Sequence, residues 1–242
     1  MFDTPVTIDD KRLCAYKPCT IGRELFNSAQ VGGVVTITPR ELLLSDNGRY
    51  TYSWLATRGF VPQLINNTTL TDVVLQSADL SRAIIEYCVF TRIRADWMRF
   101  KGTEVNHCTF SNVNFAHSYW RQCDMGANTF LECNLRDSTL TSINAHDVRF
   151  VKCDLTATDM SYAVLNDCTF INCTGTLARR FVRAYFAFCT FTNCDLRGAN
   201  FSYADLSTTE FINCKLDGAI FTGALLSSAT LINSDSSRII SE

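Results

Sequence analysis

Residues 191–221 read FTNCDLRGANFSYADLSTTEFINCKLDGAIF, and every fifth residue of this stretch is large and apolar. The residue two places before each large one is small, and is mostly alanine or cysteine. A helix repeats every 3.6 residues and a strand every 2.0, so a period of five fits neither. The spacing therefore predicts a repeat architecture with two inward positions in every five residues, one small and one large.

The same spacing extends from Leu70 to Leu231, with a single slip of one residue near Gly175. A second, longer period is superimposed on it, because every fourth large residue belongs to one column that is almost entirely aromatic. The members of this column are Leu70, Phe90, Phe110, Phe130, Phe150, Phe170, Phe191, Phe211 and Leu231. We therefore expect residues that are four five-residue units apart to lie above one another on successive coils.

The units Ala204-Asp-Leu206, Ala199-Asn-Phe201 and Cys194-Asp-Leu196 resemble those of the pentapeptide-repeat family. The resemblance covers roughly two thirds of the chain. It implies an all-β fold, a right-handed parallel β-helix in which four pentapeptides make one square coil. About eight coils at an interstrand spacing of about 4.8 Å would form a rod about 40 Å long. We expect residues 65–236 to form this β-helix and residues 237–242 to form a tail.

Residues 1–64 lack the spacing and are expected to form a small mixed cap or an accessory region. Thr38-Pro-Arg-Glu41 has the spacing of a capping box with proline at the first helical position, which predicts a short helix through residue 44. Residues 34–37 and the alternating Tyr50, Tyr52 and Trp54 predict strands. A cap would cover the open end of the β-helix. A recognition or translocation domain is the alternative.

The composition argues against several classes of protein. The chain has 22 Lys and Arg against 24 Asp and Glu, so we do not expect it to bind nucleic acid directly. Ten of the 12 cysteines fall on small inward positions, which favours core packing in a reducing compartment over disulfides or metal ligands. The chain shows no signal peptide and no apolar run of membrane-spanning length. We expect a cytoplasmic protein, with type III translocation into a host cell as an open alternative.

Chemistry-bearing motifs are missing from the sequence. It has no P-loop, no G-x-S-x-G and no H-E-x-x-H pattern. His107 and His146 would lie about 10 Å apart on one face, too far to share a zinc ion. We therefore expect no enzyme activity, no catalytic, cofactor-binding or metal-binding residues, and no cofactor.

The outward positions offer candidate protein-binding residues instead. The residue after each member of the aromatic column is mostly apolar on successive coils, and we call these residues the apolar stripe: Leu131, Val151, Ile171, Ile212 and Ile232. The next position holds Asn172, Asn193, Asn213 and Asn233, whose amides could bond along the stack. The other candidates are Arg179, Arg180 and Arg183 at the slip, and Trp97 at an outward corner. A structural interpretation, in which β-branched residues merely suit a flat strand, stays open.

Two functional hypotheses follow. The first is a bacterial scaffold or effector module that binds another protein through its outer faces, with a homodimer as a further option. The second, implied by the resemblance, is a DNA mimic that binds and protects a type II topoisomerase such as gyrase. About 40 Å of duplex carries more than about 20 charges. Residues 66–242 hold 18 acidic and 15 basic side chains, which weighs against the mimic.

Overall fold

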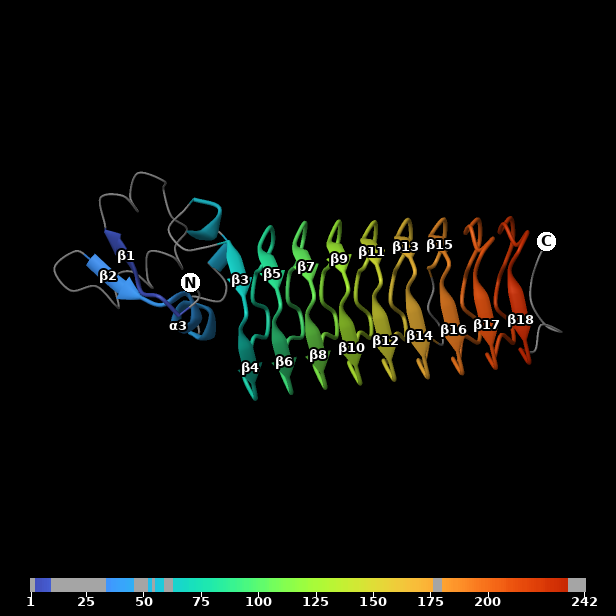
Figure 1. Ribbon diagram of the computed structural model, residues 1–242, viewed down its shortest axis with the longest axis horizontal. Helices are drawn as coiled ribbons and strands as arrows, with labels where there is room; N and C mark the ends of the chain where they lie inside the picture. Colours follow the sequence, from blue (N-terminus) through green and yellow to red (C-terminus); the bar gives the residue numbers. More distant parts are fainter. Residues whose placement is uncertain are drawn as a thin grey trace.

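The computed structural model describes residues 3–9, 34–45, 52–53, 55–58, 63–175 and 180–234. From residue 63 onward the chain winds into a parallel β-helix of about eight coils, with the amino-terminal region at one end of the rod (Figure 1). The all-β fold class that the family resemblance implied is confirmed.

One side of the rod is a nine-stranded parallel sheet. Its strands are β4 (Thr69–Thr71), β6 (Val89–Thr91), β8 (Thr109–Ser111), β10 (Thr129–Leu131), β12 (Arg149–Val151), β14 (Thr169–Ile171), β16 (Thr190–Thr192), β17 (Glu210–Ile212) and β18 (Thr230–Ile232). A second side is a seven-stranded parallel sheet. It consists of β3 (Leu64–Asn66), β5 (Ile84–Glu86), β7 (Glu104–Asn106), β9 (Asp124–Gly126), β11 (Asn144–His146), β13 (Val164–Asn166) and β15 (Tyr185–Ala187).

The remaining two sides are joined between coils by single β-bridges, such as Val74 to Arg94 and Asp79 to Arg99. We number the four sides in chain order and count each corner with the side before it. Face 1 carries the seven-stranded sheet and face 2 the nine-stranded sheet. Face 3 holds the bridge column that begins at Val74, and face 4 holds the column that begins at Asp79.

The pairing register confirms the slip of one residue. Phe130 pairs with Phe150, which is four whole pentapeptides further along the chain. Phe170 pairs instead with Phe191, which is one position beyond four pentapeptides. Pairing returns to four whole pentapeptides between Phe191 and Phe211. The extra residue therefore lies between the bridges of Thr174 and Arg180. The outward bulge expected there, at residues 176–179, lies outside the described residues.

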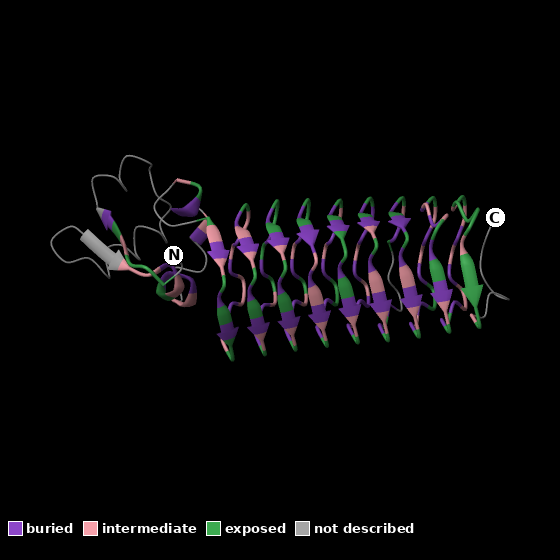
Figure 2. Ribbon diagram, viewed as in Figure 1, coloured by how far each residue is buried: buried purple, intermediate pink, exposed green. Residues whose placement is uncertain are grey.

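The aromatic column fills the interior of the rod, as predicted. Phe150, Phe170 and Phe191 are fully buried, and their rings stack with centroids 4.9 and 4.5 Å apart. Figure 2 shows the same alternation along the coils, with the central residue of each strand of the rod buried except in the last strand, β18. The coil spacing and the preferred offset of stacked rings are similar, so one phenylalanine per coil builds a continuous stack.

The small inward positions also donate hydrogen bonds to the coil before. The Thr103 and Ser138 hydroxyls donate to the carbonyls of Leu80 and Phe115 at 2.9 and 2.8 Å. The Cys133 thiol occupies the same kind of position and lies 3.4 Å from the Phe110 carbonyl. The ten described cysteines are all buried and free, which confirms their predicted core position. A thiol is thus a small apolar residue that still donates weakly to a buried carbonyl.

Nearly every corner turns through a residue in the left-handed region, with φ of 62° at Trp97 and 57° at Arg183. This conformation is costly for most side chains, and glycine adopts it freely, as at Gly102 and Gly198. The corner side chains point away from the core, so the residue types at the corners are set by something other than packing.

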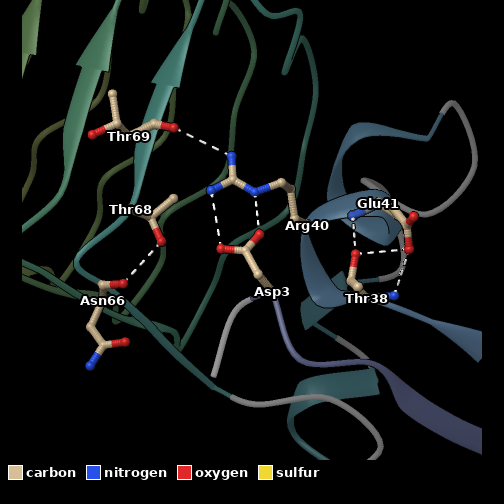
Figure 3. A network of polar contacts seen from close by, with 7 residues as sticks. All are labelled: Asp3, Thr38, Arg40, Glu41, Asn66, Thr68 and Thr69. Carbon is tan, nitrogen blue, oxygen red and sulfur yellow. Dashed lines mark hydrogen bonds and ion pairs between the residues drawn. The ribbon is translucent and has the colours of Figure 1, made fainter.

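The amino-terminal residues that the structure describes pack on the first coils. Strand β1 (Val6–Asp9), which the sequence did not suggest, pairs antiparallel with β2 (Val34–Ile37). Helix α3 (Pro39–Leu44) begins at the predicted capping box, in which Thr38 and Glu41 bond reciprocally (Figure 3). Arg40 pairs with Asp3 and donates to the Thr69 carbonyl of β4 at 3.3 Å. Residues 1–64 as a separate capping unit stay a prediction.

The strand expected across Tyr50 to Trp54 is wrong at Tyr52. Tyr52 and Ser53 are helical, and the Thr57 amide donates to the Ser53 carbonyl at 3.0 Å. The side chains of Tyr52, Leu55 and Ala56 are all buried. These three positions follow the i, i+3, i+4 pattern of one helical face. The strand was predicted from the alternation of aromatic residues, and the helical pattern prevailed over that alternation.

Candidate protein-binding surfaces

The apolar stripe lies on the outer surface of face 2. Leu131, Val151, Ile171 and Ile212 are half-buried, because each lies between neighbours on adjacent strands. Only Ile232, on the last strand β18, is exposed, at 47% of its surface. The stripe is therefore a shallow apolar surface over a flat sheet, with its most accessible member at the carboxyl end.

The asparagine ladder beside the stripe forms at least one of its expected bonds. The Asn213 side-chain amide donates to the Asn193 side-chain oxygen at 3.1 Å. Asn172, Asn193, Asn213 and Asn233 all sit in the left-handed corner conformation, which asparagine tolerates. Turn chemistry accounts for this ladder without a ligand.

Trp97 lies at the corner of face 3 with 56% of its surface exposed. Its ring stacks on His117 of the next coil, with centroids 4.5 Å apart and an angle of 18°. The sequence suggested Trp97 as a contact residue but did not pair it with His117. Their separation by four whole pentapeptides, which is one coil, could have indicated this stacking.

The arginine cluster at the slip separates into different environments. Arg180 lies on face 4, 3.6 Å from the Asp159 carboxylate. Arg183 is a corner residue whose guanidinium lies 5.9 Å from the ring centre of Tyr162 and 5.8 Å from that of Tyr203. Arg179 lies outside the described residues. The structure thus orders Arg183 in an aromatic ladder that was not predicted from the sequence.

Several exposed aromatic side chains were also missed. Tyr87, Tyr162, Phe188 and Tyr203 are corner residues with more than half of their surface exposed. Attention to the corner positions, two residues after each large inward one, would have found them. They were overlooked because the five-residue spacing draws attention to the inward columns.

The carboxyl end of the rod exposes residues that are buried elsewhere. Leu226 and Leu231 occupy inward columns, yet 37% and 40% of their surfaces are exposed, and Leu225 beside them is exposed at 59%. Within the described residues, no further coil pairs with β18. This end joins the exposed Ile232 of the apolar stripe.

Charge is distributed unevenly around the rod. Six acidic residues and no lysine or arginine point outward on the described part of face 1: Glu86, Glu104, Asp124, Asp147, Asp167 and Asp205. Face 4 has the opposite balance, with Arg82, Arg99, Lys101, Arg121, Arg180 and Arg183 against Asp79 and Asp159. The near-neutral total therefore conceals an acidic face next to a basic one, a segregation that a count over the whole chain cannot detect.

Ion pairs neutralise charges mainly on the other two faces. On face 2, Arg92 forms two hydrogen bonds with Asp72, which hold the pKa of that carboxyl below its usual range. On face 3, Arg197 lowers the pKa of Asp195 in the same way. No cluster of three potential metal ligands occurs among the described residues. No helix in the same part of the chain is long and apolar enough to cross a membrane.

Comparison with known proteins supports the family assignment. Residues 143–221 and 165–237 match a family model described as a pentapeptide repeat region, and the coils extend the same spacing back to residue 63. Residues 143–237 are therefore a pentapeptide-repeat region. No curated protein matches this chain.

Two solved structures show the same fold at low sequence identity. Two trypsin-treated variants of QnrB1, a plasmid-mediated fluoroquinolone resistance protein, are 16% and 15% identical, with TM-scores of 0.52 and 0.51. Each alignment covers 70% of this chain, and 90% and 91% of the QnrB1 chains. HetL, from the cyanobacterium Nostoc sp. strain PCC 7120, is 18% identical over 69% of this chain and 88% of its own, with a TM-score of 0.26.

Proposed function

We propose that this protein is a non-enzymatic protein-binding module, a scaffold or effector that docks a partner on face 2. The observation that carries the proposal is the apolar stripe on the flat nine-stranded sheet. The stripe runs to a carboxyl end where Leu225, Leu226 and Leu231 are exposed as well. Thr192 interrupts the stripe between Ile171 and Ile212, and an apolar surface of this extent is typical of interfaces.

The charges beside the stripe suit a protein partner. On the corner next to Leu131 and Val151, Glu132 and Lys152 pair with each other at 3.0 Å. An apolar strip with a polar, self-neutralised rim resembles the anatomy of a protein interface. The free buried thiols support a reducing location such as the cytoplasm.

Charge insertion into the stripe tests the proposal. Ile171→Asp with Ile212→Asp places two carboxylates on the stripe without changing the inward residues. Val164→Asp is the matched control, because Val164 is exposed at 39% on face 1. Partners from the native host would be identified by cross-linking and then titrated as purified proteins. The proposal requires affinity to fall in the stripe variant and to persist in the control; equal binding by both would refute it.

Self-association is tested on the same proteins by sedimentation velocity. The stripe and the exposed carboxyl end meet at Ile232, so Ile232→Asp should shift a dimer to monomer. A sedimentation coefficient that stays at the monomer value at every concentration of the unaltered protein would reject the homodimer.

A second candidate is topoisomerase binding by mimicry of DNA, and face 1 is the observation that favours it. Five of its six carboxylates lie on successive coils, and no outward lysine or arginine on the described part of this face neutralises them. The resemblance in fold to a fluoroquinolone resistance protein suggests the target. Mimicry predicts that the protein inhibits or protects purified gyrase in a supercoiling assay. It also predicts that Asp147→Lys with Asp167→Lys abolishes the effect. Indifference of gyrase at micromolar protein would exclude it.

A further inference from the structure

Face 4 carries cations that lack partners. Within the described residues, only Arg180 of its six basic side chains forms an ion pair with a carboxylate. Lys101 and Arg121 occupy equivalent positions on successive coils, so their Cα atoms lie about 4.8 Å apart. Arg99 lies beside them on the same face. Like charges stacked in this way repel one another, and a bound polyanion would remove the repulsion.

Two hollows lie along this face. The first, of about 870 Å³, is lined by Trp97, Arg99, Lys101 and Tyr119, with Ser77 on the coil before. The second, of about 510 Å³, lies towards the carboxyl end and is lined by Arg121, Ser142, Tyr162 and Arg180, among others. Each hollow therefore combines two cations and one carboxylate, Asp79 or Asp159, with an exposed aromatic ring.

The aromatic ring is presented in the same way in both hollows. In the first, Trp97 is supported on one side by the stacked His117 ring, and the residue below its other side is the small Ser77. In the second, Tyr162 is supported by the Arg183 guanidinium, and the residue below its other side is the small Ser142. Each ring thus has a neighbour on one side and faces an open space one coil deep on the other, which is room for another planar group.

The choice of residues at these corners favours a ligand over a packing role. Trp97 and Tyr162 adopt φ values of 62° and 61°, the conformation of nearly every corner in the rod, and Gly102 at the corner after Trp97 shows that a corner needs no side chain. An exposed aromatic residue in this conformation costs stability and gains little burial. The recurrence of ring, support, serine and cation indicates a recognition surface.

We propose that face 4 binds single-stranded nucleic acid. Bases stack on the open sides of Trp97 and Tyr162, and the phosphates lie against Arg99, Lys101 and Arg121. Cations that follow the backbone, together with aromatic platforms for bases, are the features by which proteins bind single strands without sequence preference. In duplex DNA the bases are stacked on each other and cannot reach the rings. An acidic protein segment would satisfy the cations but leave both rings uncovered.

This proposal departs from the expectation based on total charge. That expectation averaged face 4 with the acidic face 1, whereas a ligand on one side of a rod experiences mainly the nearer face, because salt screens charges beyond about 8–10 Å. The proposal is independent of protein binding on face 2, which lies on the opposite side of the coil.

The test is a fluorescence anisotropy titration of the full chain with a labelled ten-nucleotide oligothymidine at 50 mM salt. We expect micromolar binding that weakens with salt, with a slope of log affinity against log salt of about −2 to −3, since three to four phosphates are neutralised at about 0.7 each. Arg99→Ala with Lys101→Ala should reduce that slope by about 1.4. Trp97→Ala should weaken binding about tenfold with the slope unchanged.

Two matched controls separate recognition from general attraction. Tyr87 is also an exposed corner ring stacked on a histidine, His107, at 4.8 Å, but it belongs to the acidic face 1. Arg149 is an outward cation on face 2. Tyr87→Ala and Arg149→Ala should each leave oligothymidine binding unchanged.

Several results would overturn the proposal. One is the absence of binding at 100 µM protein, which is ~10⁻⁴ M and the weak end of non-specific affinity. Another is an equal loss of oligothymidine affinity in the Trp97→Ala and Tyr87→Ala variants. A third is equal affinity for a duplex of the same length. Equal affinity for polyglutamate, with no effect of Trp97→Ala, would assign the face to an acidic protein segment instead. Circular dichroism of each variant confirms that the coils remain folded.

Discussion

Removal of one ring from the aromatic column tests how the rod is held together. Phe170 is fully buried, and its ring stacks between Phe150 at 4.9 Å and Phe191 at 4.5 Å. Phe170→Ala would create a cavity in a narrow core whose walls are hydrogen-bonded coils and cannot collapse easily. Buried phenylalanine-to-alanine changes cost about 3–5 kcal/mol, and two lost ring stacks at about 0.5–1.5 kcal/mol each place this site near the upper end.

The assay is urea unfolding followed by circular dichroism, with the free energy of unfolding obtained by linear extrapolation. Phe170→Leu is the matched control, because Leu70 and Leu231 occupy the two ends of the same column. It keeps most of the volume and loses only the stacking, so we expect a loss of about 1–2 kcal/mol. A loss below about 1 kcal/mol for Phe170→Ala would show that the ring is not packed inside the rod.

Three further outcomes are expected. Thr38→Ala removes the capping box of α3 and should lower the free energy of unfolding by about 1 kcal/mol in the same urea assay; no change would contradict the cap geometry. Burial raises the pKa of the Cys123 thiol from 9.0 to about 12, so the unfolded chain loses this proton first. The free energy of unfolding should therefore be unaffected by ionisation of this thiol below pH 9 and should fall by up to about 1.4 kcal/mol per pH unit between pH 9 and 12. Urea unfolding at several pH values measures this fall. It should be shallower in Cys123→Ala. Arg92→Ala should return the pKa of Asp72 toward 3.8, as followed by NMR titration, while leaving the urea unfolding midpoint nearly unchanged because the pair is exposed.

The interior of the β-helix could be predicted almost residue by residue. Each coil repeats the same geometry, so one inward phenylalanine such as Phe130 implies the next at Phe150, and the slip before Phe191 was visible as a break in the spacing. The capping box of α3 could also be predicted from the sequence, because its two hydrogen bonds depend only on the spacing of neighbouring residues. Such features depend on short, regular relations between neighbours.

The features that were not predicted from the sequence depend on relations between coils or on tertiary context. Strand β1 pairs with β2 across a long intervening segment that carries no periodic signal. The stacking of Trp97 on His117 and of Arg183 between two tyrosines requires the corner positions to be aligned coil by coil, with the slip taken into account. The contrast between faces 1 and 4 arises only after charges are assigned to sides of the rod.

The most direct test of the account is an NMR measurement of contacts between successive coils. Nuclear Overhauser effects should connect backbone protons of Phe130 with those of Phe150, and of Phe191 with those of Phe211, at intervals of four whole pentapeptides. Across the slip the contact should join Phe170 to Phe191, one position beyond that interval. Contacts between residues three or four apart, as in a helix, or a contact of Phe170 with Thr190 in place of Phe191, would contradict the alignment of the coils and of the faces defined from it.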